Sequence, residues 1–224
     1  MEIYATENQQ VEAIRDFIAN NKKILMFSLV LVVCVIVGGK FWRQNVQRQS
    51  NRASDLYQEM LIADHKRDIQ ALGAKGQVLM QGFSRTPYPQ LAALLLAKNA
   101  VLENKFDKAE ELLRWVLAEK KSKSFTAEIA TERLARILQQ RGDLDAALLL
   151  LTKSKPSSAY ITIYEEAIGD IYLAKGQPDQ AQTAYKKALQ HVPIGVQAPI
   201  LQIKLMELGV ADPAAQLEQG DQDA

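Results

Sequence analysis

A period of 34 residues in the second half of the sequence constrains the fold more than any other feature. Six pairs of similar residues stand 34 positions apart: Leu134 and Ile168, Ala135 and Gly169, Leu138 and Tyr172, Gly142 and Gly176, Ala147 and Ala181, and Leu151 and Tyr185. Apolar residues between them recur at helical spacing, and Gly and Pro cluster at the breaks. We therefore predict an all-α chain in which pairs of helices recur and stack.

The last copy resembles the tetratricopeptide repeat, whose period is also 34 residues. Its matching residues are Ile168, Gly169, Tyr172, Gly176, Ala181, Tyr185, Ala188 and Pro193. With Leu134, Ala135, Leu138, Gly142, Ala147 and Leu151 of the preceding copy, they form the predicted repeat packing signature. The resemblance implies antiparallel helix pairs in which small residues allow close approach, a glycine ends the first helix and a proline closes the second.

Two less regular copies are predicted before these two. Residues 96–113 read as an earlier copy with Asn104 at the turn, and residues 46–82 as a further helical pair. Residues 200–208 are predicted to cap the exposed apolar end of the stack. Residues 43–209 are thus expected to form a tetratricopeptide-like helical-repeat solenoid.

An apolar segment precedes the repeats. Residues 24–39 run sixteen positions without a charge, and continuing to Trp42 gives about 28 Å of helix, close to the roughly 30 Å hydrocarbon core of a bilayer. We predict a single uncleaved transmembrane helix over residues 23–42. A cleaved secretory signal is the alternative, although a long N-terminal segment precedes the apolar run and no A-x-A cleavage site follows it.

The two ends of the chain are predicted to be short accessory segments. In residues 1–22, Val11, Ile14 and Ile18 recur at helical spacing, which indicates a short amphipathic helix. This helix either contacts a membrane surface or a partner, or is a solvated segment that precedes the anchor. Residues 210–224 carry four acids and no base, so we predict a disordered acidic tail. Basic residues flank the span on both sides, and the C-terminal side has one more than the N-terminal side. This difference favours a cytoplasmic C-terminal domain only weakly, so charge leaves the sidedness open.

The composition favours binding over catalysis. Lys and Arg number 27 against 26 Asp and Glu, so no field of one sign would attract nucleic acid. One Cys and two His cannot form a Cys/His zinc site or an internal disulfide. His65 and His191 read as helix-end residues, and no nucleotide-binding, metalloprotease or serine-hydrolase motif occurs. We predict no catalytic residue, no metal, no cofactor and no nucleic-acid partner.

A concave surface for a partner is what stacked helix pairs usually provide. If the resemblance holds, the inner helices would turn nine residues toward this groove: Leu91, Leu94, Lys98, Glu132, Arg136, Gln139, Glu166, Asp170 and Leu173. Their mixed charges do not match the basic clamp by which some co-chaperone repeats hold an acidic peptide. The alternative is a face of solvated charges, with partner contacts elsewhere.

Three features together resemble the bacterial YfgM family, the ancillary subunit of the SecYEG translocon. They are the opening sequence Met1-Glu2-Ile3-Tyr4, the segment from Glu12 to Phe17 followed by one span, and the C-terminal repeats. The resemblance implies a cytoplasmic N-terminus, an inner-membrane anchor in the lipid bilayer and a periplasmic repeat domain. The implied partners are the SecYEG translocon, a PpiD-like periplasmic chaperone and secretory polypeptides.

Two other functions are compatible with the same features. One is a regulator that restrains a response regulator of the RcsB type, which requires the relevant surface to face the cytoplasm. The other is a scaffold for a different envelope complex.

Overall fold

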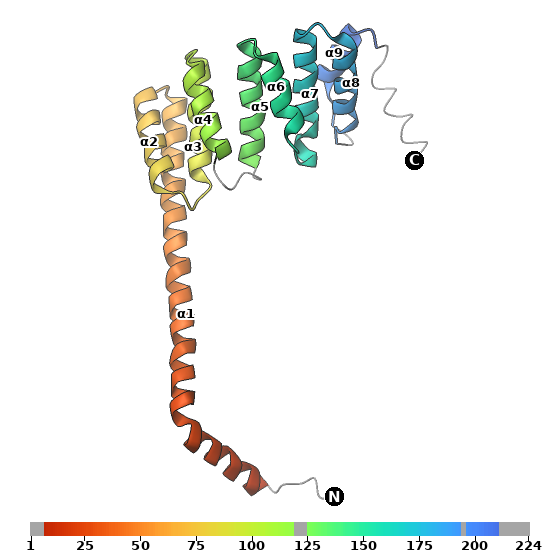
Figure 1. Ribbon diagram of the computed structural model, residues 1–224. Helices are drawn as coiled ribbons and strands as arrows, with labels where there is room; N and C mark the ends of the chain where they lie inside the picture. Colours follow the sequence, from red (N-terminus) through yellow and green to blue (C-terminus); the bar gives the residue numbers. More distant parts are fainter. Residues whose placement is uncertain (1–6, 119–124, 194–195, 211–224) are drawn as a thin grey trace, which may run out of the picture. The chain divides into compact units, whose positions relative to one another are not determined.

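A computed structural model describes residues 7–118, 125–193 and 196–210 of the chain (Figure 1). The chain divides into two compact units, Met1–Asp55 and Leu56–Ala224. The described residues form helices and no strand, as the sequence predicts. The predicted acidic tail lies outside the described residues, except Val210, which is buried.

The first unit is formed by most of one long helix, α1 (Glu7–His65). Its segment Leu29–His65 contains a stretch that is long and apolar enough to cross a membrane, and none of that stretch is buried by protein. The predicted domain boundary at residues 42 and 43 falls inside this helix, which continues without a break into the second unit.

The described residues of the second unit form these further helices: α2 (Ile69–Gly82), α3 (Tyr88–Leu102), α4 (Phe106–Ala118), α5 (Phe125–Gln140), α6 (Leu144–Lys153), α7 (Ser158–Ala174), α8 (Pro178–Gln190) and α9 (Pro199–Glu207). From α2 onward each described helix packs against the next in the chain, and α3, α5 and α7 also contact one another in that order. The result is a stack of antiparallel pairs (Figure 1). The predicted all-α repeat architecture is therefore confirmed.

In the part of the stack that the structure describes, five residues in the left-handed conformation mark the repeat period. They are Arg67, Asn104, Gly142, Gly176 and Gly209, with φ between 57° and 85°, and each follows the end of an odd-numbered helix. After each of them, the next amide donates to a carbonyl five residues earlier, as Gln177 does to Tyr172 at 2.9 Å. This is the Schellman closure of a helix. The backbone thus repeats one turn five times, including at positions where the residue type varies.

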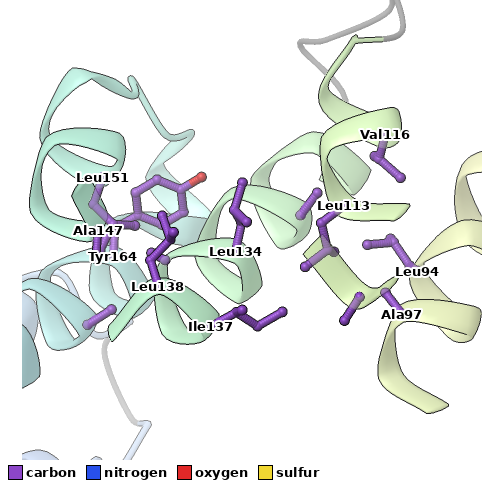
Figure 2. Close-up of a cluster of buried hydrophobic side chains, with 14 of the residues drawn as sticks. Leu94, Ala97, Leu113, Val116, Leu134, Ile137, Leu138, Ala147, Leu151 and Tyr164 are labelled. Atoms are coloured by element: carbon purple, nitrogen blue, oxygen red, sulfur yellow. The ribbon is translucent and has the colours of Figure 1, made fainter. Parts of the chain in front are cut away.

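The repeat packing signature supplies much of the core (Figure 2). Leu134, Ala135, Leu138, Ala147, Leu151, Ile168, Gly169, Ala181, Tyr185 and Ala188 are all buried. Tyr172 is half-buried and packs against the main core cluster and the C-terminal one, whereas Pro193 is exposed beyond the end of α8. Gly169 is needed for close approach, because a Cβ there would lie 2.3 Å from Cε1 of Tyr185.

The C-terminal end of the stack has its own apolar cluster. Ala181, Tyr185, Ala188 and Leu189 of α8 pack with Leu201, Leu205 and Val210. Helix α9 therefore covers α8 with two buried leucines, which is the role predicted for residues 200–208.

Candidate functional site

The predicted groove residues come from α3, α5 and α7, the first helices of successive pairs. Eight of the nine reach or approach the surface, but Leu94 is 5% exposed and belongs to the main core. Leu94 is therefore a packing residue and cannot line a groove. Leu91 and Gln139 are half-buried, while Leu173 is 40% exposed.

A pocket of about 380 Å³ lies between α3 and α5. Its floor is apolar and includes Ala97, Val101 and Ile137, and its polar lining residues are Lys98, Arg133, Arg136 and Gln140. The residues that line it include three cations and no carboxylate. This end of the predicted groove therefore combines an apolar floor with a basic rim.

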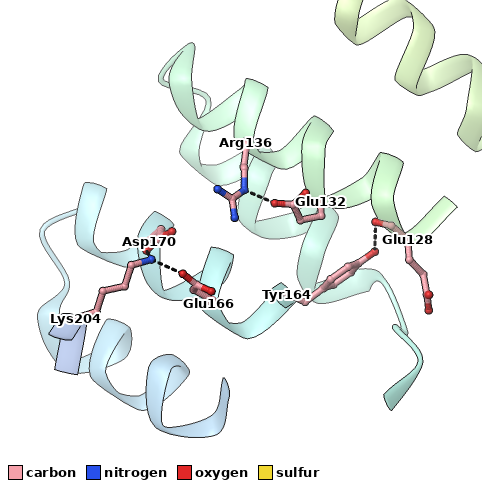
Figure 3. Close-up of polar contacts among 7 residues, drawn as sticks. All are labelled: Glu128, Glu132, Arg136, Tyr164, Glu166, Asp170 and Lys204. Carbon is pink, nitrogen blue, oxygen red and sulfur yellow. Dashed lines mark hydrogen bonds and ion pairs between the residues drawn. The ribbon is translucent and has the colours of Figure 1, made fainter. Parts of the chain in front are cut away.

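Carboxylates hold two of these cations at the rim. Lys98 Nζ lies 3.0 Å from Asp64 Oδ2, and Arg136 is paired with Glu132 one turn earlier on α5 (Figure 3). Arg133 instead donates from Nη1 to the carbonyl of Leu94 at 3.2 Å. Among the described residues no carboxylate pairs with Arg133, so most of its N–H donors are free to meet a ligand.

At the α7 end of the predicted groove, two carboxylates of α7 are paired with a lysine of α9. Lys204 Nζ lies 2.7 Å from Glu166 and 2.6 Å from Asp170, both on α7 (Figure 3). The Tyr185 hydroxyl also donates to Asp170 Oδ1 at 2.6 Å. Burial and this hydrogen bond to a carboxylate raise the pKa of Tyr185. Glu166 and Asp170 are thus occupied by neighbours within the fold.

Asp64 connects α1 to the groove. Its carboxylate accepts hydrogen bonds from Asn99 Nδ2 at 2.7 Å and from Lys98 Nζ at 3.0 Å. The Asn99 hydrogen bond, with Lys98 beside it, lowers the pKa of Asp64 although burial opposes this. The end of α1 and helix α3 are therefore joined by a charge-assisted contact.

Sequence reasoning missed Asp64, Arg133 and Lys204. A signal was present for Lys204, because a lone lysine next to Leu205 in an apolar capping helix needs a carboxylate partner. Arg133 precedes the buried Leu134 and interrupts an apolar face of α5. Its position on the α3 side of that helix required the structure.

The described residues contain no group of three or more His, Cys, Asp or Glu side chains that could hold a metal ion. His65 and His191 are exposed, and Nδ1 of His191 lies 2.8 Å from the carbonyl of Lys187 at the end of α8. What the arrangement supports chemically is recognition of a ligand by charge and apolar contact.

Comparisons with known proteins identify the family. A family model described as a tetratricopeptide repeat-like domain matches residues 15–210. A Haemophilus influenzae protein named ancillary SecYEG translocon subunit is 30% identical over 189 residues, which cover 82% of this chain and 89% of that protein. The chain belongs to the YfgM family.

Other members resemble the chain over nearly its whole length. The Escherichia coli protein of the same name is 29% identical over 210 residues, covering 94% of this chain and all of that protein. Among solved structures outside these relatives, the crystal structure of BtubC from P. vanneervenii is 20% identical to this chain, with a TM-score of 0.45 over 79% of this chain and 87% of that one. The match to the tetratricopeptide repeat-like model includes the candidate membrane span as well as the repeats.

Proposed function

We propose that this chain is a membrane-anchored accessory subunit of the Sec translocon that binds partners through its repeat domain and has no chemistry of its own. The observation that carries the proposal is membership of a family whose named relatives are ancillary SecYEG translocon subunits. The pocket between α3 and α5 supports it, because an apolar floor with polar edges suits a peptide ligand.

The proposed arrangement places α1 in the inner membrane, with residues 1–22 in the cytoplasm and the repeat domain in the periplasm. There the domain would meet secretory polypeptides and a PpiD-like chaperone and would link the two. Alkaline phosphatase fused after the last residue tests the sidedness, because this enzyme is active only outside the cytoplasm. High activity is expected, and an inactive but intact fusion would contradict the arrangement.

Site-specific photocrosslinking tests the partners and the surface. A photoreactive side chain at Leu173, which lies on α7 in the predicted groove, should capture SecY, a PpiD-like chaperone or a secretory chain in membranes. Leu149 on α6 is the matched control, since it is a similarly exposed leucine outside the predicted groove. Equal capture from both positions would place the partner contacts elsewhere, and capture of cytoplasmic proteins alone would contradict the proposal.

A regulator of a response regulator is the second candidate, and the charge distribution is the observation that favours it. Lys40 at the end of the span and Arg43, Arg48 and Arg52 after it have no intervening acid, and they outnumber the basic residues on the N-terminal side by one, a margin in the direction of a cytoplasmic C-terminal domain. The phosphatase fusion separates the two candidates, because only the regulator requires an inactive fusion.

A further inference from the structure

The pocket between α3 and α5 is matched in chemistry by the C-terminal segment of the same chain. Residues 211–224 contain Asp212, Glu218, Asp221 and Asp223 and no basic residue. Their one large apolar residue is Leu217, directly before Glu218. An apolar side chain next to a carboxylate is the combination that an apolar floor with a basic rim would bind.

Arg133 is the cation at the pocket that has no carboxylate partner among the described residues. It is half-buried between α3 and α5 and uses one N–H group on the Leu94 carbonyl. A guanidinium in this position gains from a carboxylate that binds through two oxygens. Lys98 and Arg136 lie at the same pocket and add to its positive charge, although each also contacts one acid of the fold.

The C-terminal segment can reach this pocket. Odd-numbered helices of the stack run in the same direction, so α3, α5 and α9 end at the same edge (Figure 1). The pocket includes Leu102 and Gln140, at the ends of α3 and α5. The pocket lies between α5 and α3, two to three helix spacings of about 8–10 Å from α9, a distance of about 20–25 Å. The seven residues from 211 to 217 span about 23–25 Å when fully extended, so Leu217 reaches the pocket with this tether extended.

We propose that residues 211–224 dock into the pocket between α3 and α5, with Leu217 on its apolar floor and Glu218 paired with Arg133. The segment then acts as an intramolecular competitor for the groove. Only the competition rests on the proposed function, since docking is a property of the chain alone.

Cysteine crosslinking in the full-length chain tests docking directly. In a Cys34→Ser background, Leu102→Cys at the pocket and Leu217→Cys should form an intrachain disulfide under mild oxidation. Leu149→Cys with Leu217→Cys is the control pair, because Leu149 is 52% exposed on α6, away from the pocket. Equal yields from the two pairs, or a disulfide that joins two chains, would overturn the proposal.

Charge removal tests the role of the rim. Arg133→Gln with Arg136→Gln should lower the yield of the pocket disulfide about fivefold, as should high salt. Arg114→Gln is the matched control, because Arg114 also pairs with a glutamate four residues earlier but does not line the pocket. An unchanged yield in the double variant, with thermal unfolding like that of the parent, would overturn the assignment of Arg133.

The competition has a separate readout. A variant that ends at Val210 should give stronger photocrosslinking to partners from Lys98 than the full-length chain does. If no partner is captured from either chain while the pocket disulfide still forms, the proposed function fails and docking stands. If the disulfide forms and removal of residues 211–224 leaves partner capture unchanged, the segment docks without competing and that part of the proposal is overturned.

Discussion

Glycine 169 shows how a single residue sets the spacing of a helix pair. The ring of Tyr185 lies so close that an added Cβ would be 2.3 Å from Cε1 and 2.5 Å from Cδ1. The ring is fully buried and its hydroxyl is bonded to Asp170, so it has little freedom to move. We expect Gly169→Ala to lower the free energy of unfolding by about 1–3 kcal/mol, measured by urea denaturation.

Gly73→Ala is the control for this prediction. Gly73 lies inside α2 with no atom within 4 Å of an added Cβ, so alanine should stabilise the chain there by about 0.5–1 kcal/mol. Tyr185→Leu in the Gly169→Ala background should recover part of the loss by removing the ring. A loss of the same size at both glycines would mean that helix propensity, and not the tyrosine contact, explains the result.

The carboxylate of Asp64 makes stability depend on pH. Its folded pKa is lowered, first by the hydrogen bond from Asn99, so its contribution is present above the unfolded value of about 4 and is lost as pH falls through the folded value. Asp64→Asn should therefore cost about 1–2 kcal/mol at pH 7 and progressively less below about pH 4. Urea denaturation across this range, with the exposed Asp55→Asn on the same helix as control, measures the difference.

At the scale of the element, the helix-ending turns depend on backbone conformation more than on packing. Gly142 and Gly176 have φ of 85° and 71°, and no atom lies within 4 Å of an added Cβ at either site. Alanine should still cost about 1–2 kcal/mol at each, because L-residues resist the left-handed region. Arg67, at φ 57°, should respond in the opposite sense, with Arg67→Gly gaining up to about 1 kcal/mol in thermal unfolding. Equal effects at all three sites would exclude backbone strain as the cause.

These turns also show how far the sequence predicts the elements. Gly142 and Gly176 carry a recognised turn residue at the repeat spacing, and Asn104 is a permitted substitute, so three turns are predictable. Arg67 carries no such signal, because an arginine rarely adopts this conformation, and its turn is visible only in the backbone. The helices themselves follow from apolar periodicity.

The candidate groove was less predictable than the helices, for a physical reason. Repeat spacing assigns a residue to a face of its helix, and Leu94 shares that face with Lys98. Which residue is covered depends on the angle and distance of the neighbouring pairs, which bury Leu94 in the main core and leave Lys98 exposed. The ion pairs of Asp64 and Lys204 join helices more than 30 positions apart, so no local pattern fixes them.

At the scale of the repeat unit, the main apolar cluster and the C-terminal one, as formed by the described residues, meet at Tyr172. In such stacks stability is close to a sum of unit and interface contributions, so damage at one end stays largely local. Leu205 is fully buried in the C-terminal cluster, and Leu205→Ala should remove about 2–4 kcal/mol of local stability. Hydrogen exchange should then accelerate in α8 and α9 while α3 to α5 keep their protection.

The reciprocal variant Leu113→Ala, in the main cluster, should accelerate exchange around α3 to α5 instead. If either variant accelerated exchange evenly across the unit, the repeats would unfold as one cooperative body, and the two clusters would have no independent energetic meaning.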